Sequence, residues 1–214
     1  MHVDSHGKRL TDYPRPSVAV DTAVLSVVDG ALVVALVVDH RTGGRRLPGT
    51  FLHAGERLAD AVRRSLAAKA GLHDLEPVQL GVLDDPERDD RGWVLSVAHL
   101  AVVPASTLAG LEPAPVAEAH GLDHDHDAIV DLAVARVRAD HATRPDPNRL
   151  LGEPFPMTEL RELHEAVAGE RLQPDTFRRW ALPWLVDSGE QRRGTVGKPA
   201  ALFTHPADPA PVAR

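Results

Sequence analysis

The sequence predicts an α+β fold, with an α/β/α sandwich followed by a small domain of two helices and a β-hairpin. Over residues 17–142, apolar runs typical of strands alternate with stretches that have helical spacing. After a proline-rich break, the pattern changes to two short helices and two strand-like segments. Hydrophobic residues make up 43% and charged residues 26% of the 214 residues. This ordinary globular composition excludes a wholly disordered chain and a coiled-coil rod.

Composition and charge restrict the possible compartments and partners. No apolar run reaches the roughly 18 residues of a membrane span, and the first ten residues lack the apolar segment of an export signal. We therefore expect a soluble, cytoplasmic protein with no membrane partner. The chain has no cysteine, which excludes disulfides and thiolate metal sites. Its net charge is −7, so any binding to DNA must use a local basic patch.

The first part of the chain supplies the strands and the first helix of the sandwich. Strands are predicted over residues 18–28, 31–38, 78–83 and 93–103. Asp29-Gly30 is a favourable tight-turn pair, so the first two strands are expected to form a hairpin. Leu58, Val62 and Leu66 lie four residues apart and predict a helix over 58–70. Gly71 is a suitable residue to end that helix.

A second helix and a linker complete this part. Ile129, Ala133 and Val137 have helical spacing, which predicts a helix over 127–138 with Asp125 as its N-cap. Four prolines lie between Ala139 and Pro156. They indicate a linker, which we place at residues 143–156. Residues 1–16 are expected to be flexible, and residues 205–214 to form a disordered tail.

The pattern over residues 157–204 is that of a winged helix-turn-helix domain. Thr158 and Asp175 are predicted to cap two short helices, the first ended by Gly169 and the second by Pro183. Two strands, over 184–187 and 200–204, are expected to follow as a hairpin. The order helix, turn, helix and hairpin within about 50 residues favours a DNA-binding fold.

Residues 47–72 carry the spacing of a motif that cleaves phosphates. They read LPGTFLHAGERLADAVRRSLAAKAGL and resemble the box of the Nudix hydrolases, which act on nucleoside diphosphates linked to another group. Glu56, Arg64 and Gly71 match the box, while Thr50 replaces its first glycine. In the family, the matching Glu and Arg brace the loop against the helix. The resemblance implies a Nudix-like domain over residues 17–142 in which these three residues are a structural remnant.

The metal ligands of this box are absent. Nudix chemistry requires Mg²⁺ to neutralise the diphosphate and to activate the attacking water, and Mg²⁺ prefers anionic oxygen ligands. The three glutamate positions of the box helix are occupied here by Ser65, Ala68 and Lys69. We therefore expect no catalytic residues, no metal and no cofactor. The closely spaced His and Asp residues over 120–127 are not expected to form a metal site either, because neighbouring loop residues seldom converge on one ion.

The segment after the box resembles that of the Nudix proteins that recognise ADP-ribose. Residues 79–101 match it, with Asp90 in place of a proline and His99 in place of a tyrosine, and the resemblance continues to about residue 138. It makes Arg88 and Arg91 candidates for contact with phosphate or ribose. Lys69 is a third candidate, because an ammonium group at a metal position could neutralise a phosphate without activating water. The alternative is that Lys69 only favours the dipole at the end of its helix.

Residues 151–203 resemble the winged helix of the Nudix-related transcriptional regulators, which repress genes of NAD metabolism. The resemblance rests on Pro154-Phe155 with Thr158-Glu159-Leu160, on Asp175 with Phe177-Arg178-Arg179, and on Gly197-Lys198-Pro199-Ala200. From Arg171 to Lys198 there are six cations against three anions, a local basic patch. The predicted DNA-binding residues are those of the recognition helix and the wing: Thr176, Arg178, Arg179, Arg192, Arg193 and Lys198.

Three functions remain in competition at this point. The first is a transcriptional repressor that binds a double-stranded operator as a homodimer and senses an ADP-ribose-like effector through a catalytically dead Nudix-like domain. Its target genes belong to NAD metabolism or, as in related regulators, to sugar catabolism. The second is a hydrolase of ADP-ribose-like substrates with an accessory domain, which requires the missing glutamates. The third is a protein-interaction module, which does not require arginines on the recognition helix.

Overall fold

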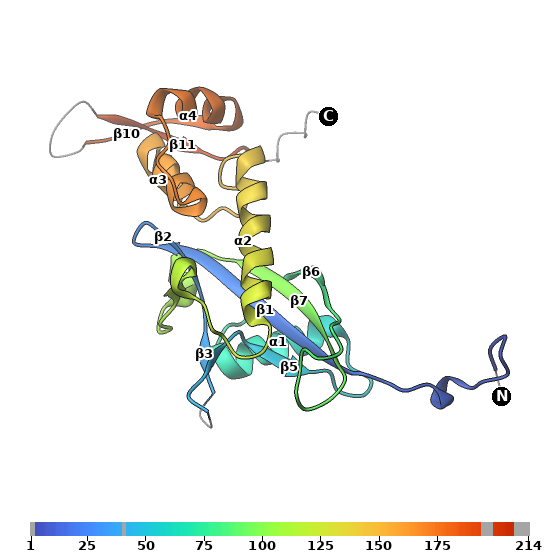
Figure 1. The fold of residues 1–214 in the computed structure, drawn as a ribbon. Coiled ribbons are helices and arrows are strands. Elements are labelled where there is room, and N and C mark those ends of the chain that lie inside the picture. Colours follow the sequence, from blue (N-terminus) through green and yellow to red (C-terminus); the bar gives the residue numbers. More distant parts are fainter. Residues whose placement is uncertain (1–2, 40–41, 194–198, 208–214) are drawn as a thin grey trace.

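The computed structural model describes residues 3–39, 42–193 and 199–207. Figure 1 shows two units, one above the other, with the long helix α2 running from the lower unit to the upper one. An N-terminal arm extends sideways from the lower unit and includes the short 3₁₀ helix η1 (Leu10–Asp12). Within the described ranges, no helix is long and apolar enough to cross a membrane.

The lower unit is built on a six-stranded mixed sheet. Its strands are β1 (Ser17–Val28), β2 (Ala31–Val34), β5 (Gly49–Phe51), β6 (Val78–Leu83), β7 (Val94–Val102) and β8 (Ala114–Pro115). The order is β6-β7-β1-β2-β8, and β5 also pairs with β1. β1 and β7 are parallel, whereas the other pairs are antiparallel. Two further 3₁₀ turns, η2 (Ala105–Leu108) and η3 (Val116–Glu118), flank β8.

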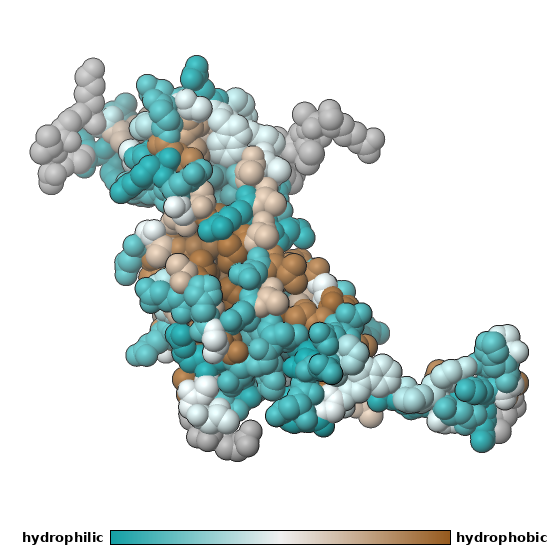
Figure 2. Space-filling model, in the orientation of Figure 1, coloured by the Kyte–Doolittle hydropathy of each residue, from teal (hydrophilic) through white to brown (hydrophobic). Residues whose placement is uncertain are grey.

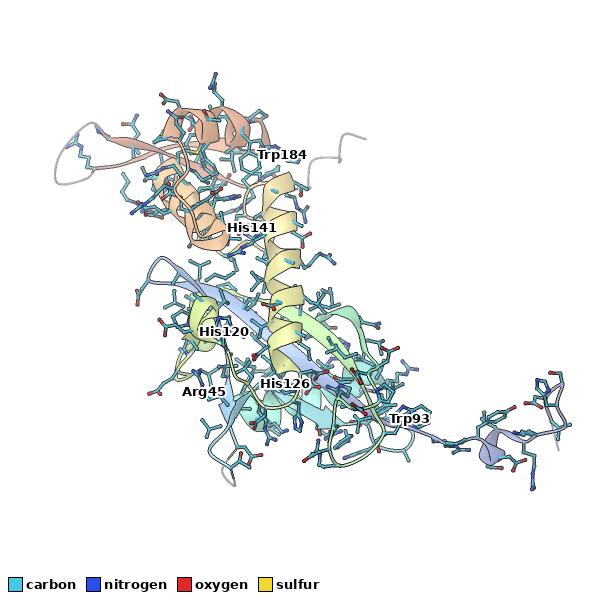
Figure 3. The ribbon with its side chains drawn as sticks, viewed as in Figure 1. Arg45, Trp93, His120, His126, His141 and Trp184 are labelled. Carbon is cyan, nitrogen blue, oxygen red and sulfur yellow. The ribbon has the colours of Figure 1, made fainter. Side chains whose placement is uncertain are left out.

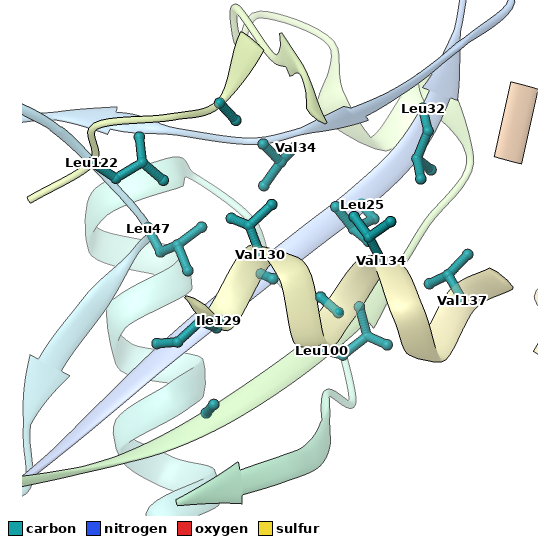
Figure 4. Packing of buried hydrophobic residues seen from close by; sticks show 14 of the residues in the cluster. Leu25, Leu32, Val34, Leu47, Leu100, Leu122, Ile129, Val130, Val134 and Val137 are labelled. Carbon is teal, nitrogen blue, oxygen red and sulfur yellow. The ribbon is translucent and has the colours of Figure 1, made fainter. Parts of the chain in front are cut away.

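One helix covers each face of this sheet. α1 (Leu58–Ala70) packs on the face that carries Val20 and Val24 of β1. α2 (His126–Thr143) packs on the opposite face, where Ala23 and Leu25 of the same strand lie. Figure 4 shows the α2 side of this core, with the apolar residues of the helix against those of the strands. Alternate strand residues thus reach opposite faces, and the predicted α/β/α sandwich is confirmed.

Two predictions for this unit were wrong in their extent. The apolar run 31–38 does not form one strand: β2 ends at Val34, and β3 (Val37–Val38) pairs instead with β4 (Arg45–Arg46) in a separate hairpin. Both segments are apolar, so the sequence does not reveal the change of partner. The second helix is longer than the predicted 127–138 and includes residues 139–143, because His141 is buried. It ends before Arg144, whose extended conformation is the one that Pro145 imposes.

The upper unit is a winged helix, as the sequence predicts. It contains α3 (Met157–Ala168), α4 (Pro174–Ala181), η4 (Leu182–Trp184) and a sheet of β9 (Phe155–Pro156), β10 (Val186–Arg192) and β11 (Ala200–Thr204). β9 lies in the predicted linker, and β10 extends into the segment predicted as a loop after residue 187. The core of this unit gathers around Phe155, which is fully buried, with Leu160 and Phe177.

The two predicted helix caps in this unit were also wrong. α3 begins at Met157 after Pro156, so Thr158 lies inside its first turn and makes no cap. α4 is capped by Gln173, whose side-chain oxygen accepts a hydrogen bond from the amide of Thr176 at 2.7 Å. Pro174 then takes the first helical position, where a missing N–H costs nothing. Asp175 therefore lies two residues too far along the chain to cap the helix.

Candidate functional site

The ion pair between Glu56 and Arg64 connects the Nudix-like loop to helix α1. The Nε and Nη2 atoms of Arg64 each donate a hydrogen bond of 2.8 Å to the carboxylate of Glu56. The same guanidinium donates to the Thr50 hydroxyl at 3.2 Å and to the Phe51 carbonyl at 3.0 Å. Gly71 ends the helix in the left-handed conformation, with φ of 64°. The three residues proposed as a remnant of the box therefore lie in the contacts that shape its loop and helix.

The Glu56–Arg64 pair predicts a measurable acid sensitivity. The hydrogen bonds from Arg64, followed by the one from the His53 amide, lower the pKa of Glu56 from 4.5 to about 2. Because the folded pKa lies below the unfolded one, the stabilisation is complete above about pH 4.5 and is lost as the pH falls toward 2. We expect Glu56→Gln to flatten the pH dependence of the free energy of unfolding in that window, measured by urea denaturation. Glu76→Gln, which changes an exposed carboxylate near Arg63, is the control and should leave the pH dependence unchanged.

The metal-ligand positions of the box helix do not fit a magnesium ion. Ser65 is buried against the sheet, with no hydrogen-bond partner for its hydroxyl. Ala68 is exposed and offers only a methyl group. Lys69 directs its ammonium group to the carbonyl oxygen of Gly49. A hydroxyl, a methyl and an ammonium group provide no anionic oxygen ligand, so no step of a metal-assisted hydrolysis can be derived from them.

Lys69, Arg88 and Arg91 lie around the same cavity, which has a volume of about 170 Å³. Its wall comes from β1, β5, the end of α1, the loop after β6 and the start of α2. Arg46 adds a fourth cation, whereas the carboxylates in the wall are those of Asp21 and Asp89. The wall thus carries more positive than negative side chains, which suits an anionic ligand.

The cations around this cavity are already paired. Arg88 binds the carboxylate of Asp125 with two nitrogens, one of them at 2.8 Å, and its side chain is only 3% exposed. The two other arginines each bind an aspartate, Arg91 to Asp89 at 2.6 Å and Arg46 to Asp39 at 2.9 Å. An anion entering the cavity would therefore exchange partners with these carboxylates. Asp125 takes the N-cap position of α2, as predicted, but its carboxylate is engaged with Arg88 and makes no cap hydrogen bond to the helix.

Burial lowers the pKa of Lys69. Partial burial, followed by repulsion from Arg46, lowers the pKa of its ammonium group, while Asp21 and Asp39 act in the opposite direction. Arg91 differs from the other cations, since it is half exposed and lies over the ring of Phe51, 5.3 Å from the ring centre. The cavity thus presents one partly buried amine and one accessible guanidinium.

Two residues outside the predicted ligand set, Asp21 and His126, also line the cavity, and Ser96 contacts Asp21. The Asp21 carboxylate accepts a hydrogen bond from Ser96 at 2.5 Å and lies 3.2 Å from Nε2 of His126. Burial opposes the ionisation of Asp21, but the hydrogen bonds from His126 and Ser96 outweigh it and lower its pKa. The sequence did offer a signal for Asp21, because it is a charged residue inside the apolar run of β1, and a buried carboxylate requires polar partners.

The Asp21 carboxylate leaves room only for glycine at position 49. A Cβ atom at this position would lie 1.7 Å from Oδ1 of Asp21, so no larger residue fits without moving the carboxylate.

The side chains of the neighbouring His and Asp cluster, residues 120–127, have separate partners. Nδ1 of His126 accepts a hydrogen bond from the Leu47 amide, and Asp127 accepts two from the amides of residues 121 and 122. Among the described residues, no group of three such side chains is arranged to hold a metal.

The predicted DNA-binding residues of the recognition helix lie on the outside of α4. Thr176, Arg178 and Arg179 are exposed, while Phe177 between them is buried. The guanidinium carbon of Arg178 lies 5.9 Å from the centre of the Phe203 ring. Nε of Arg179 donates to the Asp175 carbonyl at 3.4 Å. Both arginine side chains therefore extend from the exposed surface of α4.

The wing residues differ from one another. Arg192 is tied to α3, since it binds the carboxylate of Glu159 and donates to the Pro154 carbonyl at 3.3 Å. Arg193 is exposed and has no ion pair or hydrogen bond to another described residue. Lys198, together with Gly197, lies outside the described residues. Of the predicted phosphate contacts, Arg193 is thus the one that is exposed and unengaged within the described part of the wing.

Known proteins match both units. A family model of the NrtR DNA-binding winged helix domain matches residues 147–204. The chain is 27% identical over 208 residues to the ADPR responsive transcriptional repressor NtrR of Acinetobacter baylyi, which covers 90% of this chain and 83% of that protein. It is 30% identical over 129 residues to the ADP-ribose pyrophosphatase of Methanocaldococcus jannaschii, which covers 58% of this chain and 76% of that protein.

Solved structures of one relative are also similar to this chain, both to the two units together and to the sandwich by itself. NrtR of Shewanella oneidensis in complex with a 27mer DNA has a TM-score of 0.73 and 29% identity, covering 88% of this chain and 93% of that chain. Its NUDIX domain in complex with ADP ribose has a TM-score of 0.53 and 25% identity, covering 62% of this chain and 95% of that chain. A Nudix-type sandwich joined to a winged helix defines a two-domain transcriptional regulator. The chain belongs to the NrtR family of Nudix-related transcriptional regulators.

Proposed function

We propose that this protein is a transcriptional repressor that binds operator DNA through its winged helix and releases it when ADP-ribose occupies the Nudix-like cavity. The observation that carries the proposal is the likeness over 88% of the chain to a relative solved with DNA bound. The cation-lined cavity supports an anionic nucleotide as the effector. We assign sensing to residues 17–142 and DNA binding to residues 157–204, and we place the protein in the cytoplasm with the DNA that it binds. Genes of NAD metabolism are the proposed targets.

A hydrolase is the second candidate, because the chain is also similar to an ADP-ribose pyrophosphatase. That similarity covers only the sandwich, and the box helix carries Ser65, Ala68 and Lys69 where the reaction needs carboxylates. We therefore propose that the cavity binds ADP-ribose and leaves its diphosphate intact. Lys69, Arg88 and Arg91 are the residues proposed to contact the ligand.

Helix α2 offers a route from the cavity to the winged helix. Asp125, just before its first turn, binds Arg88 in the cavity. Near the other end, Nε of Arg138 donates to the Val167 carbonyl of α3 at 3.0 Å, and His141 contacts the ring of His164. Figure 3 shows His126 and His141 toward opposite ends of this helix, which at 18 residues is about 27 Å long. A diphosphate that takes Arg88 from Asp125 would release the start of α2, and we propose that this movement repositions the winged helix.

The proposal is tested with a fluorescent operator duplex and the purified protein. We expect ADP-ribose to lower operator affinity at least 10-fold, which requires only about 1.4 kcal/mol of coupling between the two sites. In the same samples, with Mg²⁺ present, we expect no release of AMP. AMP as the control ligand should act more weakly, because it lacks the diphosphate. Turnover near 1 per second, an ordinary enzymatic rate, together with unchanged DNA binding would favour the hydrolase.

We also propose that the protein acts as a homodimer on a near-palindromic operator. A twofold-symmetric protein places its two recognition helices on symmetric half-sites. We expect light scattering at micromolar concentration to give twice the mass of one chain. We also expect a duplex with one half-site deleted to bind much more weakly. A monomer that binds a single half-site as tightly as the full operator would contradict this prediction.

A further inference from the structure

A second cavity, of about 450 Å³, lies where α2 meets α3 and α4. It shares no lining residue with the Nudix-like cavity. Its volume is within the range of small-molecule sites, roughly 300–1,000 Å³. Apolar side chains from the two winged-helix helices and the turn between them, among them Val167, Leu172 and Phe177, form much of its wall. Figure 2 shows apolar side chains gathered at the waist of the molecule, between the two units.

Aromatic rings dominate one side of this cavity. His164 lies 5.0 Å from the Phe177 ring and 5.3 Å from the Trp180 ring, and these two rings are 5.5 Å apart. His141 adds a fourth ring, 5.2 Å from His164. Burial lowers the pKa of His164 to about 3 and also lowers that of His141. Both imidazoles are therefore neutral at pH 7, and this side of the cavity offers uncharged ring surfaces that suit a planar aromatic ligand.

Arg138 is the one Lys or Arg side chain among the described residues that line this cavity. Arg138 is held in place because its Nε donates to the Val167 carbonyl. Its two Nη atoms have no ion pair with any described carboxylate, although Glu170 also lines the cavity. A planar guanidinium anchored in this way presents two parallel N–H groups, which is the geometry that binds a carboxylate.

We propose that this cavity binds a small aromatic carboxylate, with its ring against Phe177 and Trp180 and its carboxylate on Arg138. Gln173 and Thr176, in and just before the first turn of α4, also line the cavity. A bound ligand would therefore contact the helix that carries Arg178 and Arg179. This site is separate from the Nudix-like cavity, with which it shares no lining residue, and the proposal does not depend on the identity of the effector that binds there.

The test uses 2-naphthoate as the probe and its neutral isostere 2-naphthamide, with binding to the full chain measured by calorimetry. We expect 2-naphthoate to bind with a Kd below 1 mM and at least 10-fold more tightly than the amide. Arg138→Gln should abolish this preference, and Arg138→Lys, which keeps the charge and loses the fork, should reduce it. Glu170→Gln should strengthen binding of the carboxylate alone.

A pair of matched substitutions on α2 locates the probe. Ala142 lines the cavity and Ala139 does not, although both are exposed on the same helix. We expect Ala142→Phe to abolish binding of 2-naphthoate and Ala139→Phe to preserve it, with circular dichroism showing that both variants are folded. Equal binding by these two variants would overturn the proposal. So would equal affinity of wild type for the two probes, or no binding up to 1 mM.

Discussion

Replacing Arg178 or Arg179 by alanine is expected to lower operator affinity by about 5- to 150-fold. Both side chains extend from the exposed surface of α4, the helix that enters the major groove in helix-turn-helix proteins. One good bidentate contact to a base contributes about 1–3 kcal/mol of discrimination, which sets the size of the effect. The measurement is fluorescence anisotropy with the operator and with an unrelated duplex. The loss should be confined largely to the operator.

Arg171→Ala is the matched control, because it removes one arginine of the same basic segment from outside α4. The Arg171 side chain is 90% exposed and lies near Glu165 at 3.1 Å. We expect only a small, sequence-independent loss of affinity from this variant. Arg193→Ala should weaken binding to both duplexes and reduce the salt dependence, as the loss of a phosphate contact does. If both α4 variants bind the operator like wild type, the recognition helix is misassigned.

Lys69→Glu is expected to lower affinity for ADP-ribose by at least about 30-fold, or about 2 kcal/mol, when a chelator removes divalent ions. Two unit charges about 4 Å apart interact by about 4 kcal/mol at an effective dielectric constant of about 20, and partial exposure of the lysine reduces this value. The substitution replaces an attractive charge at the cavity with a repulsive one. Calorimetry with ADP-ribose in chelator measures the change.

Lys8→Glu provides the control, since it changes the net charge by the same amount in the N-terminal arm, away from the cavity. It should bind ADP-ribose like wild type. If Lys69→Glu also binds ADP-ribose like wild type in chelator, Lys69 does not replace the metal. Its charge then only interacts favourably with the helix dipole at the end of α1. The same conclusion holds if wild type binds ADP-ribose only when Mg²⁺ is added.

Residues close together in the chain determined what could be predicted from the sequence. The spacing of Leu58, Val62 and Leu66 located α1, and Gly71 located its end, because both are local properties of a helix. The segments around the box and the recognition helix carried the family resemblance for the same reason. Local patterns also placed Lys69, Arg88 and Arg91 among the candidates, although they could not show that one cavity holds all three.

The tertiary structure alone decided which charges meet. Arg88 and Asp125 are 37 residues apart, and Asp21 and Ser96 are 75 apart, so no local pattern pairs them. The length of α2 and the third strand of the wing sheet also depended on contacts between distant segments. The physical reason is that periodicity encodes which face of an element is buried, whereas the partner of a buried polar group is set by the backbones that approach it.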